Sequence, residues 1–240
     1  MDSASLSIAV AQPRTVPHDL AHNAAQHAAA IRAAGARVVV FPELSLTGYE
    51  LDAAPVALDD PALAVVQDAC RDADAVAFVG AVVSDAGDDS IATLRIDADA
   101  VAVAYRKMWL HGGEVDRFAA GEELGIVDVD GWRVGLAICR DSSVSRHTAA
   151  LARAGVDLYL AGVLDVPAER EERAARSFLM ARALGAPVAI ASYADATSLY
   201  PETTGGSCIL AADGTVLAAA DTAPGSVATA TVRRAAEPSA

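Results

Sequence analysis

Three segments of the chain repeat one pattern, in which an alanine-rich stretch ends at a glycine and a short apolar run follows. A glycine just after a helix adopts the left-handed conformation that ends it, and a short β-branched run is typical of a buried strand. The pattern therefore predicts three helix-to-strand units. Their helices and strands are 24–34 with Val38-Val39-Val40, 148–154 with 156–160, and 174–184 with Val188-Ala189-Ile190.

Hairpin signals lie between these units. Short aspartate- or Asp-Gly-containing turns separate two apolar runs at three places, and such turns favour antiparallel strands. Helices that alternate with buried strands, together with hairpins, predict an α/β chain with mixed sheets. Two sheets covered by outer helices would bury the strands on both faces. The predicted hairpins are 91–96 with 101–105, 125–129 with 132–138, and 208–211 with 215–220.

Length and composition indicate one domain. The chain has 240 residues, of which 53% are hydrophobic, and it has no linker-like or low-complexity stretch. A chain of this size can bury a sizeable core without dividing. We expect the domain to span residues 1–234 and residues 235–240 to form a mobile tail or a dimer arm.

The formal net charge of -14 argues against nucleic-acid binding, which needs clustered Lys and Arg, and against an anionic membrane surface. The three cysteines form no C-x-x-C pair, and the histidines show no zinc-ligand spacing. The N-terminus lacks the basic region of a signal peptide, and no apolar run approaches membrane-spanning length. We therefore expect a cytoplasmic protein that binds neither nucleic acid nor membrane.

Cys139 stands where the apolar run 135–138 meets polar residues that can start a helix. The unpaired N–H groups and the positive dipole end of a helix N-terminus favour the thiolate, the form of cysteine that attacks carbon. Two charged residues, Glu43 and Lys107, also end apolar runs. A nucleophile, a base and an acid at the ends of strands predict a hydrolase site.

Amide or nitrile hydrolysis needs a nucleophile, a proton carrier and donors for the developing negative charge. Cys139 can attack, Glu43 can carry the proton, and the Lys107 ammonium with the backbone N–H of Arg140 can hold the oxyanion. Taken singly, each residue also has a structural interpretation. A cysteine at a strand end can be inert packing, and Glu43, Lys107 and Glu114 can be ordinary surface charges.

Four segments taken together favour the catalytic interpretation over the structural one. Their residues and their order resemble those of the nitrilase superfamily of carbon–nitrogen hydrolases. The resemblance covers nearly the whole chain, from residue 8 to about residue 231. The segments are Phe41-Pro42-Glu43, Arg106-Lys107 before a glycine-rich loop with Glu114, Gly135-x-x-Ile138-Cys139-x-Asp141, and Thr204-Gly205-Gly206-Ser207.

The resemblance implies a four-layer α-β-β-α sandwich that commonly pairs through its outer helices, here as a homodimer or higher homo-oligomer. It implies that Glu43 is the general base, Lys107 the oxyanion-stabilising lysine and Cys139 the nucleophile. Glu114 would be the second glutamate, which lies near the lysine and helps to position substrate or water. The family uses no metal or organic cofactor.

The chain departs from the family pattern directly after Cys139. An aromatic residue often follows the nucleophile, whereas this chain has Arg140 and then Ser142-Ser143-Val144-Ser145-Arg146. An inward-pointing Arg140 could pair with a substrate carboxylate, and an outward-pointing one would be an ordinary salt-bridge residue. Tyr49 likewise could be a pocket wall or part of the core.

The leading hypothesis is an amidase that converts a small-molecule amide to a carboxylic acid and ammonia through a cysteine thioester. A nitrilase that acts on a nitrile is the nearest alternative, because the same three residues can attack a nitrile carbon. A serine amidase would use Ser207 instead, although a second serine and a nearby lysine are missing from its signature. A scaffold of the same fold without turnover is the non-catalytic alternative.

Overall fold

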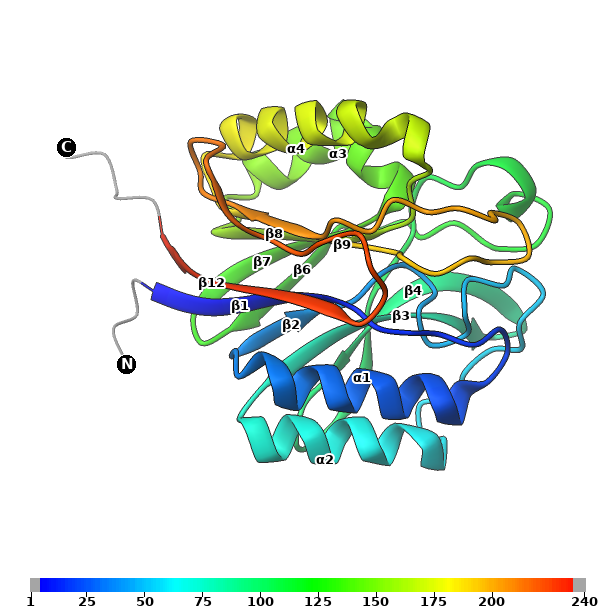
Figure 1. Ribbon diagram of the computed structural model, residues 1–240. Helices are drawn as coiled ribbons and strands as arrows, with labels where there is room; N and C mark the ends of the chain where they lie inside the picture. Colours follow the sequence, from blue (N-terminus) through cyan, green and yellow to red (C-terminus); the bar gives the residue numbers. More distant parts are fainter. Residues whose placement is uncertain (1–4, 235–240) are drawn as a thin grey trace.

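The computed structural model describes residues 5–234 of the chain, so the expected tail at 235–240 lies outside the described residues. Two six-stranded sheets pack face to face, and two helices cover the outer face of each (Figure 1). The architecture is therefore the expected α-β-β-α sandwich. Within residues 5–234, no helix is long and apolar enough to cross a membrane.

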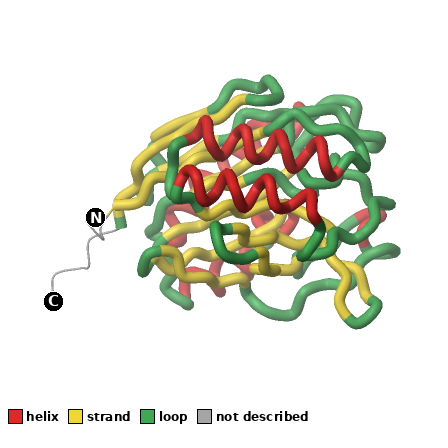
Figure 2. The backbone as a smooth tube through the Cα atoms, turned by 90° about the horizontal axis from the view of Figure 1, so that it is seen from below, coloured by secondary structure: helices red, strands yellow, loops and turns green. Residues whose placement is uncertain are grey.

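The first sheet has the order β12-β1-β2-β3-β4-β5. Strands β1, β2 and β3 are parallel to one another, and the other neighbours are antiparallel. Helices α1 and α2 lie side by side across its outer face (Figure 2). The elements are β1 (Ser5–Gln12), α1 (Leu20–Ala34), β2 (Val38–Val40), α2 (Ala64–Ala73), β3 (Val76–Asp85), β4 (Asp88–Ile96), β5 (Val101–Arg106) and β12 (Ser226–Arg233).

The second sheet has the order β11-β10-β9-β8-β7-β6, with β7, β8 and β9 parallel. Helices α3 and α4 cover its outer face. The elements are β6 (Gly125–Val129), β7 (Trp132–Ile138), α3 (Ser145–Arg153), β8 (Leu158–Val163), α4 (Arg170–Leu184), β9 (Val188–Ser192), β10 (Cys208–Leu210) and β11 (Val216–Ala219).

The core has three parts because each sheet is apolar on both faces. The largest cluster fills the space between the sheets, where Ile8, Phe78 and Trp132 are almost fully buried. A second cluster lies under α1 and α2, and a third lies under α3 and α4. Alanines such as Ala24 and Ala28 line the buried side of α1, so the helix packs on its sheet through small side chains.

The predicted elements are present, with shifted bounds at several ends. The glycines after the three predicted helices all have positive φ, from 54° to 67°. Helix α4 begins at Arg170 rather than at 174, because its first turn is charged and carries no apolar pattern. Helix α3 begins at Ser145 rather than at 148, and β8 begins at 158 rather than at 156. The pattern did not single out α2, although it is a regular helix.

Candidate active site

Four sequence-predicted side chains meet between the sheets. The Lys107 ammonium lies 2.6 Å from Glu43 Oε1 and 2.7 Å from Glu114 Oε1. Neither the Lys107 nor the Glu43 side chain has exposed surface, and that of Glu114 is 4% exposed. Cys139 follows β7 of the opposite sheet and lines a cavity of about 160 Å³. The structure thus places one cation between two carboxylates, beside a thiol.

Two glycines, one in each sheet, position the segment that carries Glu43. A Cβ atom on Gly80 of β3 would lie 2.4 Å from the carbonyl oxygen of Pro42 and from the backbone nitrogen of Leu44. A Cβ on Gly162 of β8 would lie 2.6 Å from the carbonyl oxygen of Phe41. Only glycine fits at such distances, so both sheets hold the backbone on either side of the carboxylate. No sequence pattern marks these glycines, because a lone glycine in a strand does not reveal which backbone approaches it.

The two oxygens of Glu43 have different surroundings. Oε1 accepts a hydrogen bond from the Lys107 ammonium. Oε2 is buried and has no hydrogen-bond partner among the described residues. A buried acceptor without a partner is costly and is characteristic of functional sites. The carboxylate therefore has one oxygen held by Lys107 and one free to accept a proton.

Hydrogen bonds to the backbone of other residues hold Lys107 and Glu114 in place. The Lys107 N–H donates to the Ile91 carbonyl over 2.8 Å, which continues the pairing of β5 with β4 beyond the end of the strand. Glu114 ends a short 3-10 turn, Gly112–Glu114, and its Oε2 accepts a hydrogen bond from the N–H of His111 over 3.1 Å. These contacts direct the other Glu114 oxygen to the lysine.

Cys139 lies at a strained turn. Its φ is 41°, a left-handed value that is rare for residues other than glycine. The turn leads from β7 into a five-residue 3-10 helix, Cys139–Ser143, and α3 begins only at Ser145. The thiol donates a weak hydrogen bond to the carbonyl oxygen of Leu164 at 3.5 Å.

The expectation that a helix N-terminus stabilises the Cys139 thiolate was wrong. Burial, followed by the negative charge of Glu43, raises the pKa of the thiol well above its ordinary value. The positive charge of Lys107 acts in the opposite direction but does not outweigh them. A short 3-10 turn has little dipole, whereas desolvation of the thiolate is large. The resting thiol is therefore protonated and needs a base.

The charges of the other two groups depend on one another. Burial raises the pKa of Glu43, and the nearby Glu114 charge raises it further, while Lys107 lowers it. Burial lowers the pKa of Lys107, but the negative charges of Glu43 and Glu114 outweigh this effect and raise it above its ordinary value. Lys107 thus stays an ammonium ion at neutral pH.

Tyr49 and Arg140 both line the cavity. Tyr49 is 3% exposed, and its ring makes edge contacts with Tyr193 and Tyr200 at centroid distances of 5.7 and 5.9 Å. Arg140 is exposed and makes no ion pair with an acidic side chain within the described residues. Their binding of a substrate stays a prediction.

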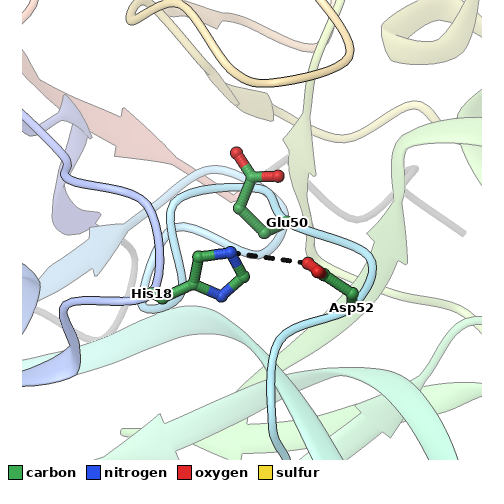
Figure 3. A group of neighbouring side chains, drawn as sticks. All are labelled: His18, Glu50 and Asp52. Atoms are coloured by element: carbon green, nitrogen blue, oxygen red, sulfur yellow. Dashed lines mark ion pairs between the residues drawn. The ribbon is translucent and has the colours of Figure 1, made fainter.

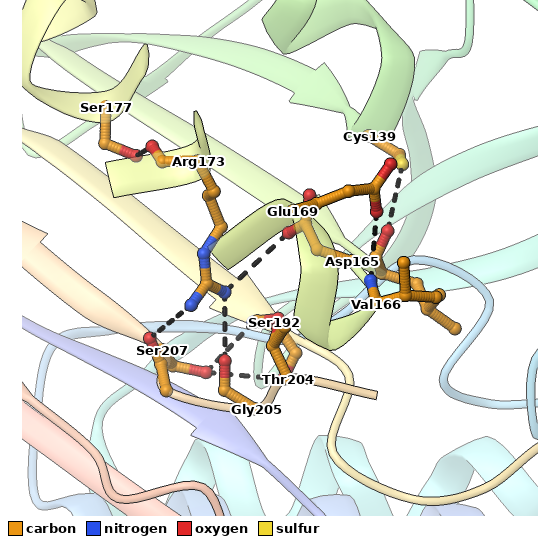
Figure 4. Close-up of polar contacts among 12 residues, drawn as sticks. Cys139, Asp165, Val166, Glu169, Arg173, Ser177, Ser192, Thr204, Gly205 and Ser207 are labelled. Carbon is orange, nitrogen blue, oxygen red and sulfur yellow. Dashed lines mark hydrogen bonds and ion pairs between the residues drawn. The ribbon is translucent and has the colours of Figure 1, made fainter. Parts of the chain in front are cut away.

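The cavity is also lined by charged residues that no sequence pattern marks. Asp165 and Glu169 line the same cavity as Cys139 and lie close to it in Figure 4. Arg176 pairs with Asp165 at 3.2 Å and with Glu172 at 3.3 Å. Glu169 accepts a hydrogen bond from the backbone of Val166. Charged residues in loops and helix starts carry no sequence signal that separates them from surface charges.

Ser207 belongs to the scaffold. It has no exposed surface, and its hydroxyl donates a hydrogen bond to Gln12 Oε1 over 2.8 Å. The Ser207 hydroxyl oxygen also accepts a hydrogen bond from the N–H of Ser192 over 2.9 Å. The neighbouring carbonyl of Gly205 accepts a hydrogen bond from Arg173 over 2.9 Å (Figure 4). A buried hydroxyl with these partners joins β1, β9 and β10 and is not available to a substrate.

A second cluster of ionisable side chains contains His18, Glu50 and Asp52 (Figure 3). His18 Nε2 lies 3.4 Å from Asp52, and both side chains are exposed. Glu50 is buried, and its two oxygens accept the N–H and hydroxyl of Ser198. Since Ser198 lies in the loop that carries Tyr200, Glu50 holds one wall of the cavity in place.

Residues 7–237 match the carbon-nitrogen hydrolase family, and the chain belongs to this family. Among curated proteins, it is 32% identical over 170 residues to a "Hydrolase in pqqF 5'region" of Pseudomonas protegens. It is 28% identical over 148 residues to an (R)-stereoselective amidase of a Pseudomonas species. These alignments cover 65% and 59% of this chain but only 58% and 54% of the two relatives.

Solved structures share the fold. A CN-hydrolase superfamily protein from Xanthomonas campestris matches with a TM-score of 0.84 and 21% identity, over 95% of this chain and 90% of that one. An amidase from Nesterenkonia sp. matches with a TM-score of 0.82 and 22% identity, over 97% and 92%. The four-layer sandwich of this chain is therefore the nitrilase-superfamily fold.

Proposed function

We propose that the protein is an amidase that hydrolyses a small-molecule amide through a thioester on Cys139. The observation that carries the proposal is the buried Lys107 ammonium between Glu43 and Glu114, beside a cavity that contains a thiol. The amidases among its relatives support it. In one structure of a variant of the Nesterenkonia enzyme, the acetamide moiety of fluoroacetamide is added covalently at the active-site cysteine.

In the first half of the reaction, Glu43 takes the thiol proton and the sulfur attacks the amide carbon. A C–S bond forms while the carbonyl electrons move to oxygen, and the Lys107 ammonium with the N–H of Arg140 stabilises that oxyanion. When the carbonyl re-forms, the C–N bond breaks. Glu43 returns its proton to the leaving nitrogen, which departs as ammonia.

In the second half, water hydrolyses the thioester. Glu43, again a carboxylate, accepts a proton from the water molecule while the water oxygen attacks the acyl carbon. The C–S bond then breaks, the sulfur takes this proton from Glu43 to become a thiol again, and the carboxylic acid leaves. Glu114 holds the Lys107 ammonium from the side opposite Glu43, so that the cation keeps its place when Glu43 is protonated.

Arg140 and Tyr49 are the two residues that we propose contact the substrate. A guanidinium at the cavity, without an acidic partner among the described residues, is suited to a substrate carboxylate. We therefore place the amides of dicarboxylic acids first among the candidates, with the Tyr49 ring as the adjacent wall. Arg140→Gln should raise KM for such a monoamide at least tenfold and leave KM for a neutral amide of equal length within threefold.

Ammonia release from a panel of amides and nitriles tests the reaction. Hydrolysis of amides, with a thioester visible as a gain in intact mass that Cys139→Ala abolishes, is the expected result. Release from nitriles alone would replace the amidase with a nitrilase. Loss of activity in Ser207→Ala but not in Cys139→Ala would overturn the nucleophile.

The same proposal includes pairing of two copies of this chain. Helices α3 and α4 enclose an outward-facing groove of about 610 Å³, and Leu179 in its wall is 63% exposed. Phe178 on the same helix is 47% exposed. Large apolar side chains at such exposure indicate an interface. Light scattering should give a mass above that of one chain, and Leu179→Glu should reduce it.

A further inference from the structure

Asp141 is a fully buried carboxylate outside the proposed catalytic group. It accepts three hydrogen bonds: from the N–H of Ile138 over 2.9 Å, from the Tyr105 hydroxyl over 2.7 Å and from the N–H of Trp109 over 3.0 Å. Within residues 5–234 it forms no ion pair with Lys or Arg. A buried charge is tolerated only with such a complete set of donors.

The three donors come from the two segments that carry the proposed nucleophile and the oxyanion-binding lysine, namely the end of β7 and the end of β5 with the loop after it. Ile138 directly precedes Cys139, whereas Tyr105 and Trp109 lie two residues before and after Lys107. Ile138 is the last residue of β7, Tyr105 lies in β5 and Trp109 in the loop after β5, and these two strands belong to different sheets. One carboxylate therefore joins the ends of strands that have no backbone pairing with each other.

The surroundings of Asp141 make this connection rigid. The Tyr105 hydroxyl donates to Asp141 and lies 3.2 Å from Nε2 of the buried His147. Burial lowers the pKa of His147 to about 4, so this imidazole is neutral and can donate its Nε2–H to the tyrosine oxygen. The Trp109 ring packs edge-on against His147 at 5.2 Å. Hydrogen bonds in such an enclosed network are strong and directional.

Cys139 requires support of this kind. Its left-handed φ of 41° is unfavourable for a residue with a side chain, and surrounding contacts must hold it. The bond from Ile138 N–H to Asp141 closes the turn around the cysteine. Asp141 is not among the residues that line the cavity beside Cys139, and its accepting oxygens are already engaged. Direct contact with a substrate is therefore not its role.

We propose that Asp141 is a positioning residue that sets the place of the Cys139 sulfur relative to the Lys107 ammonium. This inference rests on the proposed function, because it takes Cys139 and Lys107 as nucleophile and oxyanion donor. Misplacement of reacting groups by about 1 Å can cost about 100-fold in rate. Loss of the connection should thus lower kcat and leave substrate affinity largely unchanged.

Asp141→Asn is the test variant, because it preserves the shape of the side chain. An amide has only one oxygen, so its NH₂ group must face the backbone N–H of Ile138 or of Trp109. One of these two hydrogen bonds to residue 141 is then lost. Tyr105→Phe is the matched milder change, since both backbone hydrogen bonds remain. Ile31→Ala, in the core between α1 and the first sheet and away from the site, is the control for loss of stability alone.

We expect Asp141→Asn to lower kcat about 30- to 100-fold with KM within threefold of the wild type. Tyr105→Phe should lower kcat less than fivefold. Ile31→Ala, assayed well below its melting temperature, should keep kcat within twofold. If Asp141→Asn loses melting temperature but keeps kcat within twofold, Asp141 is only structural and the proposal is overturned.

A second measurement separates this proposal from the amidase assignment. Peptide mapping after iodoacetamide treatment gives the alkylation rate of Cys139 without any substrate. Asp141→Asn should lower that rate at least fivefold, because the sulfur moves away from Glu43 and Lys107. An unchanged rate would overturn the positioning role. Absence of amide hydrolysis in the wild type, with this rate difference intact, would instead overturn the proposed function alone.

Discussion

Lys107 Nζ lies 2.6 Å from Glu43 Oε1, and neither side chain is exposed to solvent. A buried ion pair of this kind adds little net stability relative to apolar residues, but removing one partner leaves the other as a buried charge without compensation. The pair therefore indicates function rather than folding. Glu114 is the second carboxylate that contacts Lys107, and it gives the three charged groups a net negative charge. Burial and the charge of Glu114 both raise the pKa of Glu43.

Glu43→Gln tests the base. The amide keeps the size of the side chain and an oxygen for Lys107 but cannot accept the thiol proton, so we expect kcat/KM to fall by about 10³-fold or more. Ammonia release measures the change, and a melting curve checks that the protein is folded. Glu122→Gln, at an exposed position, is the control and should be silent. A loss below tenfold would show that another group carries the proton.

Lys107→Met tests the buried charge. It leaves Glu43 and Glu114 without their common cation, and we expect a loss of about 3–5 kcal/mol in the free energy of unfolding. Urea denaturation measures it. Lys107→Met in a Glu43→Gln background should lose less, since one of the stranded charges is gone. Equal losses in both backgrounds would contradict the coupling.

The pH dependence of kcat/KM follows from the raised pKa of Glu43. The base acts as a carboxylate, so activity is lost as the pH falls through that pKa, and the acidic inflection should lie above the ordinary value of 4.5. Glu114→Gln removes a neighbouring negative charge and should move the inflection to lower pH. An inflection that stays in place would assign it to another group. Lys107, whose pKa is raised, should stay charged through the neutral range.

Gly162→Ala tests the backbone contact behind Glu43. The new methyl group would overlap the carbonyl oxygen of Phe41, so we expect a loss of about 2 kcal/mol or more and at least a tenfold fall in kcat. Gly87→Ala is the control. Gly87 has a φ of 98° but nothing within 4 Å of a new Cβ, so it should cost about 1–2 kcal/mol with activity retained. Similar kinetics in both variants would argue against the contact.

We expect His27 to lower the free energy of unfolding in mild acid. Its ring is buried, contacts the carbonyl of Asn23 and the hydroxyl of Ser45, and has a pKa lowered by burial from 6.5 to about 4. The unfolded chain binds the proton first, so stabilisation is present above pH 6.5 and declines by about 3 kcal/mol as the pH falls to 4. His27→Gln should show a shallower decline in urea titrations at several pH values. An equal slope would assign the decline to other groups.

Much of the scaffold could be predicted from local patterns. The glycines at 35, 155 and 185 end helices with positive φ, as the alternation of alanine-rich and β-branched stretches predicted. The strands before Glu43, Lys107 and Cys139 are present, because apolar runs and turn residues act over a few neighbours. The pattern also predicted that these three residues end strands and form a hydrolase site, and the family resemblance implied the role of each.

The sequence by itself determined most of the helices and strands, the order of Glu, Lys and Cys along the chain, and membership of the family. Only the tertiary structure decided how these groups ionise. The pattern around Cys139 suggested a thiolate, but burial and the charge of Glu43 keep the thiol protonated. It also decided the contacts of Gly80, Gly162 and Asp141, which join segments far apart in sequence. Desolvation, charge coupling and close backbone packing depend on distance in space, which a local pattern does not contain.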